Sequence, residues 1–170
     1  MPKICYRVAM SLDGYIAGPK GEIDWIIMDP EVDFAAIFSQ FDTLLVGRRT
    51  FETMAAANRT TMPGMKTIVF SQTLDPSKHP EVTVVREKQN DVLTSLRAGA
   101  GKDIWLFGGG ALFQSLLDQG QVDSVEVSII PVLLGGGVPF LPSPASRRKL
   151  DLVGHKIYKS GTVSLSYDVK

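Results

Sequence analysis

The sequence predicts one α/β domain over residues 1–170, with a mixed, mostly parallel central sheet, helices on both faces and a C-terminal antiparallel hairpin. Three observations predict this fold class. Short runs rich in Val and Ile alternate with segments whose apolar residues recur at helical spacing. In the last third, apolar and polar residues alternate as they do in strands with one solvated face. The 170 residues, 44% of them hydrophobic, are enough for a single core.

The first part of the chain is expected to begin with a strand at residues 4–9. Asp29-Pro30 predicts the start of a helix, with Asp29 as N-cap and Pro30 in the first helical position. The apolar residues that follow recur at helical spacing and give one stripe: Phe34, Ile37, Phe38 and Phe41. A second strand is expected at residues 43–46, and it leads into a helix that starts at Gly47.

The same alternation continues with strands at residues 66–70, 82–86 and 104–107. Asn90 is expected to cap a helix that ends near Gly99. The last helix follows three glycines and turns four apolar residues inward: Leu112, Phe113, Leu116 and Leu117. Two further segments alternate like strands, residues 124–129 and the tail 156–170, which has a Ser160-Gly161 turn.

Composition excludes several classes of function. The 18 basic and 18 acidic residues balance, so nonspecific nucleic-acid binding lacks its main driving force. No apolar run reaches membrane-spanning length and the N-terminal residues do not read as a signal peptide, so we expect a cytoplasmic protein without a membrane partner. The single cysteine, Cys5, and only two histidines make a disulfide framework or a metal site improbable.

The first candidate anion site is the strand-to-helix junction at Gly47. A helix N-terminus offers free N–H groups and a partial positive charge, and glycine allows close backbone approach. Arg48 and Arg49 add charge-assisted hydrogen bonds and Thr50 adds a hydroxyl. The alternative is a pair of surface arginines in solvated salt bridges.

The second junction carries Gly108, Gly109 and Gly110 between an apolar strand and a helix. Such a run suits close contact between the backbone and a pyrophosphate, although Phe113 stands where the Rossmann fingerprint has glycine. The alternative is a tight turn without a ligand. A third, weaker candidate is Ser71, which follows a buried strand and could equally serve in a turn. Ligands of open α/β sheets bind outside the carboxyl ends of the strands, so three such junctions together favour a dinucleotide.

Four segments in order give the sequence a recognisable pattern: AMSLDGYIA at residues 9–17, VGRRTFE at 46–52, FGGGALF at 107–113 and IPVLLGGGVPF at 130–140. In these segments the chain resembles the dihydrofolate reductase-like superfamily, in particular its branch with the reductase domain of the riboflavin-biosynthesis enzyme. The resemblance implies the three-layer dihydrofolate reductase-like fold in a stand-alone small member, commonly a homodimer. One departure is that residues 51–54 read FETM where the riboflavin branch has a "D-P-x-L-x-V-R" segment, which leaves a ribose-phosphate pyrimidine substrate open.

The resemblance implies NADPH as the cofactor. Carried over by position, Arg48 would face the 2′-phosphate with Ser71 nearby, and Arg49 and Thr50 would hold the pyrophosphate from one helix. A cis peptide is implied between Gly108 and Gly109. The other cofactor contacts would be Ala9 and Ile16 at the nicotinamide, and Gly47, Phe107, Gly108, Gly109, Gly110, Ala111 and Leu112 around the phosphates.

The expected activity is hydride transfer from NADPH to a small pteridine- or pyrimidine-like heterocycle, as in dihydrofolate reductase or 5-amino-6-(5-phosphoribosylamino)uracil reductase. The reduction needs a proton source, and Glu31 and Asp33 are the catalytic candidates. On a helix, Glu31 would lie roughly 60° from the centre of the apolar stripe and Asp33 about 100° away, which favours Glu31 as a desolvated, protonated acid. The alternative is that both acids only complement the helix dipole.

Three residues are expected at the substrate: Asp13, Phe34 and Ser128. Asp13 could instead form an Asx-turn before Gly14, and Ser128 could simply fill space. Two other functions stay open: a non-catalytic NADP-binding or ligand-sensing module of the same fold, and a self-associating domain without a small ligand.

Overall fold

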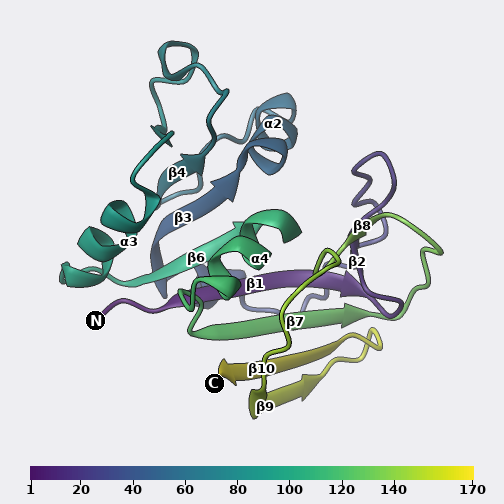
Figure 1. Cartoon of the computed structure of the whole chain (residues 1–170). Coiled ribbons are helices and arrows are strands. Elements are labelled where there is room, and N and C mark those ends of the chain that lie inside the picture. The colour runs from purple at the N-terminus through teal and green to yellow at the C-terminus, as the bar shows by residue number, and fades with distance from the viewer.

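The computed structural model describes residues 1–170 and contains ten strands and four α-helices (Figure 1). The strands are β1 (Ile4–Ser11), β2 (Tyr15–Ala17), β3 (Phe41–Gly47), β4 (Lys66–Phe70), β5 (Thr83–Val85), β6 (Asp103–Gly108), β7 (Ser124–Ile130), β8 (Val138–Pro139), β9 (Leu150–Ile157) and β10 (Val163–Val169). The helices are α1 (Phe34–Phe38), α2 (Arg48–Ala56), α3 (Gln89–Ala98) and α4 (Gly110–Asp118), and a single 3-10 turn spans Pro76–Lys78.

Eight strands form one sheet in the order β5-β4-β3-β6-β1-β7-β10-β9, and β2 and β8 form a separate ribbon beside it. The pairs from β5 to β7 are parallel, whereas β10 runs antiparallel to both β7 and β9. Parallel strands joined through helices followed by a terminal hairpin are the mixed sheet that the sequence predicts, so the predicted fold class is confirmed.

Each face of the sheet has its own apolar core because side chains alternate along the strands. On β1, Ile4 and Tyr6 enter the core that α3 and α4 cover, while Cys5 enters the core that α2 and α1 cover. The first core also takes Phe113 of α4, which stacks on Tyr6 at a centroid distance of 3.9 Å. The two cores hold the carboxyl ends of β3, β6 and β1 at one edge of the sheet.

The predicted helix start at Asp29-Pro30 is wrong. The helix begins at Phe34, with Asp33 as its N-cap, and Phe41 belongs to β3 instead of the helix. The carboxylate of Asp29 accepts from the N–H of Glu31 at 2.8 Å and from the N–H of Ser160 at 3.2 Å. Asp29 therefore caps a turn and fixes it to the β9–β10 hairpin, rather than starting a helix.

Two other predicted boundaries are also corrected. The helix α3 begins at Gln89, after Lys88 in a left-handed conformation (φ 57°), so Asn90 is inside the helix and does not cap it. The strand β9 begins at Leu150, six residues before the expected 156, and it contains a bulge where its register against β10 shifts. The longest helix, α3, has 10 residues, and none of the helices is long and apolar enough to cross a membrane.

Candidate functional site

The two glycine-bearing junctions lie side by side at the same edge of the sheet. The strands β3 and β6 are parallel neighbours with Val46 opposite Gly108, so the helices α2 and α4 that follow them start next to each other (Figure 1). A Cβ built on Gly47 would lie 3.7 Å from Cβ of Leu112 and 3.8 Å from the carbonyl oxygen of Gly108. The peptide between Gly108 and Gly109 is cis, as the resemblance implied.

The absence of side chains at this junction keeps the two segments close. A Cβ on Gly109 would lie 3.2 Å from Oγ1 of Thr50, which is tighter than ordinary van der Waals contact. The N-caps of α2 and α4 are Gly47 and Gly109, and neither helix receives a side-chain cap. The first N–H groups of both helices are thus left for an anion.

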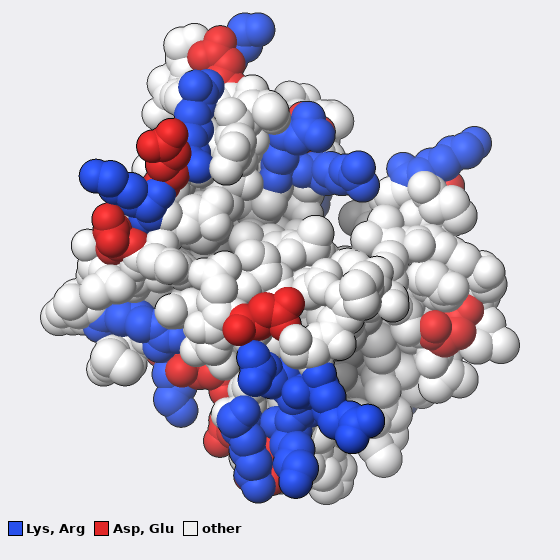
Figure 2. Space-filling model, viewed as in Figure 1, with Lys and Arg blue, Asp and Glu red and all other residues white.

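The guanidinium groups of Arg48 and Arg49 are exposed in the first turn of α2. Nη1 of Arg48 lies 3.4 Å from Oε1 of Glu52, one turn along the helix, and Arg49 forms no ion pair. Figure 2 shows basic side chains gathered over α2. An exposed i,i+4 pair is worth only about 0.3–0.5 kcal/mol, so a phosphate could displace Glu52 from Arg48 at little cost.

The residues of this junction fit the phosphate groups of a dinucleotide. Two uncapped helix N-termini, two guanidinium groups and the Thr50 hydroxyl can donate hydrogen bonds to them. The glycines leave space at the junction that any Cβ would narrow. Of the remaining predicted cofactor residues, Ala111 is exposed in the first turn of α4, and Leu112 is half-buried against Gly47. Phe107 packs edge-on against Trp105 at 5.4 Å.

Two predicted cofactor residues have clear structural roles. Oγ of Ser71 accepts from the N–H groups of Thr73 at 3.2 Å and Leu74 at 3.0 Å, which is the turn role that the sequence left open. A Cβ on Gly110 would lie only 2.7 Å from the carbonyl oxygen of Pro139. Gly110 is therefore needed for the chain after β8 to pass over the start of α4.

The predicted nicotinamide contacts lie on adjoining elements. Ala9 is half-buried on β1, opposite Ser128 of β7, and Ile16 is half-buried in the β2–β8 ribbon. Paired residues on neighbouring strands point to the same face of a sheet, so Ala9 and Ser128 share one face. Arg7 and Glu126 lie on that face too, two residues closer to the start of each strand.

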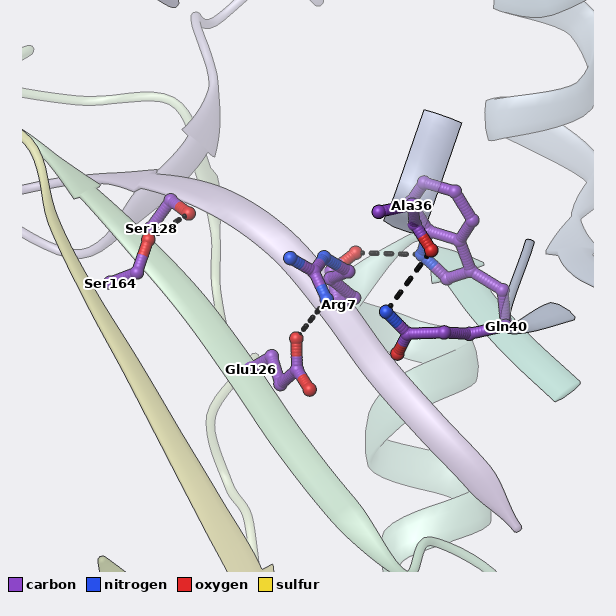
Figure 3. Close-up of polar contacts among 7 residues, drawn as sticks. Arg7, Ala36, Gln40, Glu126, Ser128 and Ser164 are labelled. Carbon is purple, nitrogen blue, oxygen red and sulfur yellow. Dashed lines mark hydrogen bonds and ion pairs between the residues drawn. The ribbon is translucent and has the colours of Figure 1, made fainter. Parts of the chain in front are cut away.

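This shared face carries a polar cleft of about 190 Å³. Its floor comes from β1, β7, β10 and β9, with Arg7, Glu126, Val127, Ser128, His155, Lys156, Tyr158, Ser164, Leu165 and Ser166 as lining residues. Arg7 and Glu126 form a hydrogen-bonded ion pair with about a quarter of each side chain exposed, and Oγ of Ser128 lies 2.8 Å from Oγ of Ser164 (Figure 3).

Sequence reasoning missed the pair of Arg7 and Glu126. The available signal was a charged residue inside an otherwise apolar strand, ICYRVAMS. Its partner could not be found from spacing, because Arg7 and Glu126 meet only through the register of β1 on β7. The carbonyl oxygen of Arg7 also accepts from Nε1 of Trp105 at 3.0 Å, which fixes the backbone beneath the pair.

The two candidate acids are not on the apolar stripe. Glu31 lies in the turn before α1, exposed, with its carboxylate 3.4 Å from Nζ of Lys159. Asp33 accepts from the N–H of Ala36 at 2.9 Å as the N-cap of α1. The helical placement that favoured Glu31 as a desolvated acid is therefore wrong, although Glu31 does lie beside the hairpin turn that follows Tyr158.

Asp13 fastens two loops together. Its carboxylate accepts from Oγ of Ser11 at 2.7 Å, from the N–H of Leu134 at 3.0 Å and from the N–H of Gly135 at 2.7 Å. These hydrogen bonds, that of Ser11 first, hold the pKa of Asp13 below its ordinary value. Phe34, the third residue predicted at the substrate besides Ser128, is half-buried at the start of α1 and packs on Phe38 with centroids 6.2 Å apart.

Sequence reasoning also placed Asp29 incorrectly, as the N-cap of a helix. Asp29 is almost fully buried. The Ser160 hydroxyl and then the Glu31 N–H stabilise the carboxylate and hold the pKa of Asp29 below its ordinary value. The turn that carries Glu31 is thus fixed to the hairpin that forms one wall of the cleft.

Comparison with known proteins shows the family to which the chain belongs. The model of the RibD C-terminal domain family matches residues 2–164. The chain is 32% identical to the uncharacterized protein YyaP of Bacillus subtilis (strain 168), covering 97% of this chain and 94% of that protein. It is 34% identical to dihydrofolate reductase type 1 of Escherichia coli, covering 86% of each.

Two solved structures share the fold. A protein assigned to riboflavin biosynthesis from Shewanella sp. PV-4 superimposes with a TM-score of 0.85 at 27% identity, covering 100% of this chain and 99% of that one. Dihydrofolate reductase from Enterococcus faecalis, solved with NADP(H), has a TM-score of 0.72 at 19% identity, covering 99% of this chain and 96% of that one. Together with the junction of glycines and arginines, the family match over nearly the whole chain means that the protein belongs to the RibD C-terminal domain family.

Proposed function

We propose that the protein is an NADPH-dependent reductase of a small pteridine- or pyrimidine-like heterocycle. The observation that carries the proposal is the convergence of the α2 and α4 N-termini, with the Cβ position of Gly109 only 3.2 Å from Oγ1 of Thr50. Reductases are present among the relatives, which supports the general class of reaction.

The cofactor would be held by the residues of this junction. Arg48 would bind the 2′-phosphate, and Arg49 and Thr50 would bind the pyrophosphate together with the N–H groups of α4. NADPH supplies the hydride when bound. The protein's part is to align the two reactants and to exclude water between them.

The heterocycle would bind in the cleft beside Ala9. A flat ring with amide and amino groups needs both donors and acceptors along its edge, and the cleft offers the guanidinium of Arg7, the carboxylate of Glu126 and the hydroxyl of Ser128. Because Arg7 and Glu126 are paired, the two side chains are oriented before the ligand arrives.

Of the two acids, we propose Glu31 as the proton donor, acting through water. Asp33 is committed to capping α1, whereas Glu31 has only the exposed Lys159 as a partner, next to Tyr158 of the cleft. The change Glu31→Gln should lower kcat at least about 100-fold, the low end for a general acid, and leave the affinity for NADPH unchanged. Asp33→Asn serves as the control, because it keeps a side chain that can cap the helix and should leave kcat unchanged.

The proposal is tested by following NADPH oxidation with a panel of heterocycles that includes dihydrofolate and 5-amino-6-(5-phosphoribosylamino)uracil. Turnover of one of them, lost in Arg7→Met and Glu126→Gln, is the expected result. The exposed positions of Glu31 and Asp33 favour one other candidate, an NADP-binding module without catalysis. Tight NADPH binding without turnover of the panel would favour that module and contradict the reductase.

A further inference from the structure

The strands β1 and β6 pair along only half of their length. Residues 4–6 of β1 lie opposite residues 104–106 of β6. Beyond these pairs β1 continues beside β7 up to Ser11, and β6 continues beside β3 up to Gly108, after a shift in its register on β3. The two strands therefore separate toward the edge of the sheet that carries the glycine junction.

The main-chain carbonyl of Arg7 is the first on β1 that faces β6 beyond the paired residues. The carbonyl of Lys3 accepts from an N–H of β6 at 2.8 Å, whereas the carbonyl of Ile4 accepts from the residue before β7 at 2.9 Å. Peptide groups alternate in direction along a strand, so the carbonyl of Arg7 points to the same side as that of Lys3. Arg7 has no paired residue on β6, and its carbonyl accepts from Nε1 of Trp105 at 3.0 Å. A side chain of β6 thus holds β1 where the pairing of the two strands has ended.

The indole of Trp105 has little freedom to move. Only 8% of the residue is exposed. Three aromatic rings pack around the indole, with centroids at 5.8 Å for Phe38, 5.3 Å for Phe41 and 5.4 Å for Phe107. A buried indole N–H needs an acceptor, and the carbonyl of Arg7 is the acceptor in this structure. The aromatic cluster therefore fixes the indole, and the indole fixes the backbone of Arg7.

The side chain of this same Arg7 lies in the polar cleft. Arg7 stands opposite Glu126 in the register of β1 on β7, and the two side chains form the ion pair on the cleft floor (Figure 3). Trp105 does not line the cleft. A shift of the Arg7 backbone would move the guanidinium group and change its pairing with Glu126. The hydrogen bond from the indole therefore acts on the cleft through Arg7.

We infer that Trp105 is a positioning residue of the cleft. Through the hydrogen bond of its indole to the carbonyl of Arg7, it fixes the ion pair of Arg7 and Glu126 where the ligand is received. The part of this inference that concerns the heterocycle rests on the proposed function, whereas the part that concerns Arg7 does not. Phenylalanine has no N–H, so Trp105→Phe removes the donor and keeps an aromatic ring in the core.

Steady-state kinetics of Trp105→Phe test the inference with the heterocycle of the panel that is turned over. KM for the heterocycle should rise about 3- to 10-fold, the effect of one neutral hydrogen bond, with kcat unchanged. The dissociation constant for NADPH should also stay unchanged, because the hydrogen bond involves neither segment of the glycine junction. Phe41→Leu is the matched control, since it removes packing against the same indole and keeps the N–H. It should lower the melting temperature without raising KM. An unchanged KM in Trp105→Phe, or an equal rise in Phe41→Leu, would overturn the inference.

Nitrogen-15 relaxation of the Arg7 side chain tests the positioning without any turnover. The order parameter of the Arg7 Nε–H bond should fall in Trp105→Phe, to the flexible range below about 0.6, and should keep its wild-type value in Phe41→Leu. Equal order parameters in all three proteins would overturn the positioning. A panel without turnover would instead contradict the proposed function and, with it, only the part of the inference that concerns the heterocycle.

The wild type alone provides a measurement if Trp105→Phe fails to fold. The chain has two tryptophans, and the indole of Trp25 donates to the carbonyl of Glu22 at 2.9 Å in an exposed turn. The indole proton of Trp105 should exchange with solvent at least about tenfold more slowly than that of Trp25, because its hydrogen bond to Arg7 is buried. Equal exchange rates would overturn the inference.

Discussion

Arg48 and Arg49 are neighbours in the sequence but differ in their partners. Arg48 has Glu52 one turn away at 3.4 Å, whereas Arg49 forms no ion pair. Both guanidinium groups are exposed at the start of α2, where the helix has no side-chain cap. Both arginines should therefore favour an anionic ligand, and their contribution to affinity should depend on the number of phosphates that the ligand carries.

The change Arg48→Ala is expected to weaken NADPH binding about 10- to 150-fold, which corresponds to the 1.5–3 kcal/mol of a charged hydrogen bond. Binding of NADH should change little, because NADH lacks the 2′-phosphate. Calorimetric titration of both nucleotides measures the two effects. Arg59→Ala is the control, since Arg59 is also exposed but follows the far end of α2. Equal losses for NADPH and NADH would show that Arg48 does not bind the 2′-phosphate.

The change Asp29→Asn is expected to lower the melting temperature at neutral pH and to matter less in acid. The folded state lowers the pKa of Asp29, so its stabilisation is complete above the unfolded value and is lost as the pH falls through the folded value. The difference in melting temperature between wild type and variant should therefore narrow below about pH 4. Asp24→Asn, at an exposed position, should show no difference, and a constant gap for Asp29→Asn would contradict the assignment.

Single residues were predictable from the sequence where their surroundings are local. The glycines and arginines of the two junctions sit within a few positions of a strand end, and the structure places Gly47, Thr50 and Gly109 together as expected. Arg7 and Glu126 are 119 positions apart and meet only through strand register, which spacing does not specify. Ser71 could be recognised only as one of two alternatives, and its hydrogen bonds favour the turn.

At the level of elements, the sequence predicted the parallel strands and α2, α3 and α4 because their apolar periodicity is strong. The start of α1 was predicted wrongly, because Asp29-Pro30 has the pattern of a helix start while the carboxylate of Asp29 is engaged by the distant Ser160. Most of β9, residues 150–155, was missed for a related reason. Its bulge at Val153 interrupts the strict alternation by which a strand is recognised.

The close passage of the chain after β8 over α4 gives a prediction at this scale. In Gly110→Ala the added Cβ would lie 2.7 Å from the carbonyl oxygen of Pro139 and 3.2 Å from that of Phe140, and backbone atoms cannot turn aside as a side chain can. The free energy of unfolding should fall by about 1–3 kcal/mol, measured by urea denaturation. Gly136→Ala is the matched control, because a Cβ there meets nothing within 4 Å. Equal stabilities for the two variants would contradict the predicted clash.

At the scale of the whole molecule, the sheet has two regions with different roles. The strands from β5 to β7 are parallel and bring the anion-binding junctions to one edge, while the β9–β10 hairpin supplies a wall of the cleft and an unpaired strand. Figure 2 shows the charged side chains in separate groups, one over α2 and another toward the hairpin. The formal charge of zero conceals this separation, and composition alone could not have predicted it.

The central claim for the whole molecule is that the starts of α2 and α4 form one site for a phosphorylated dinucleotide. Calorimetric titration of the wild-type protein with NADPH tests it most directly. We expect one site per chain, with binding that weakens on Arg48→Ala and competes with NADP⁺. Absence of any binding at millimolar NADPH would contradict the claim.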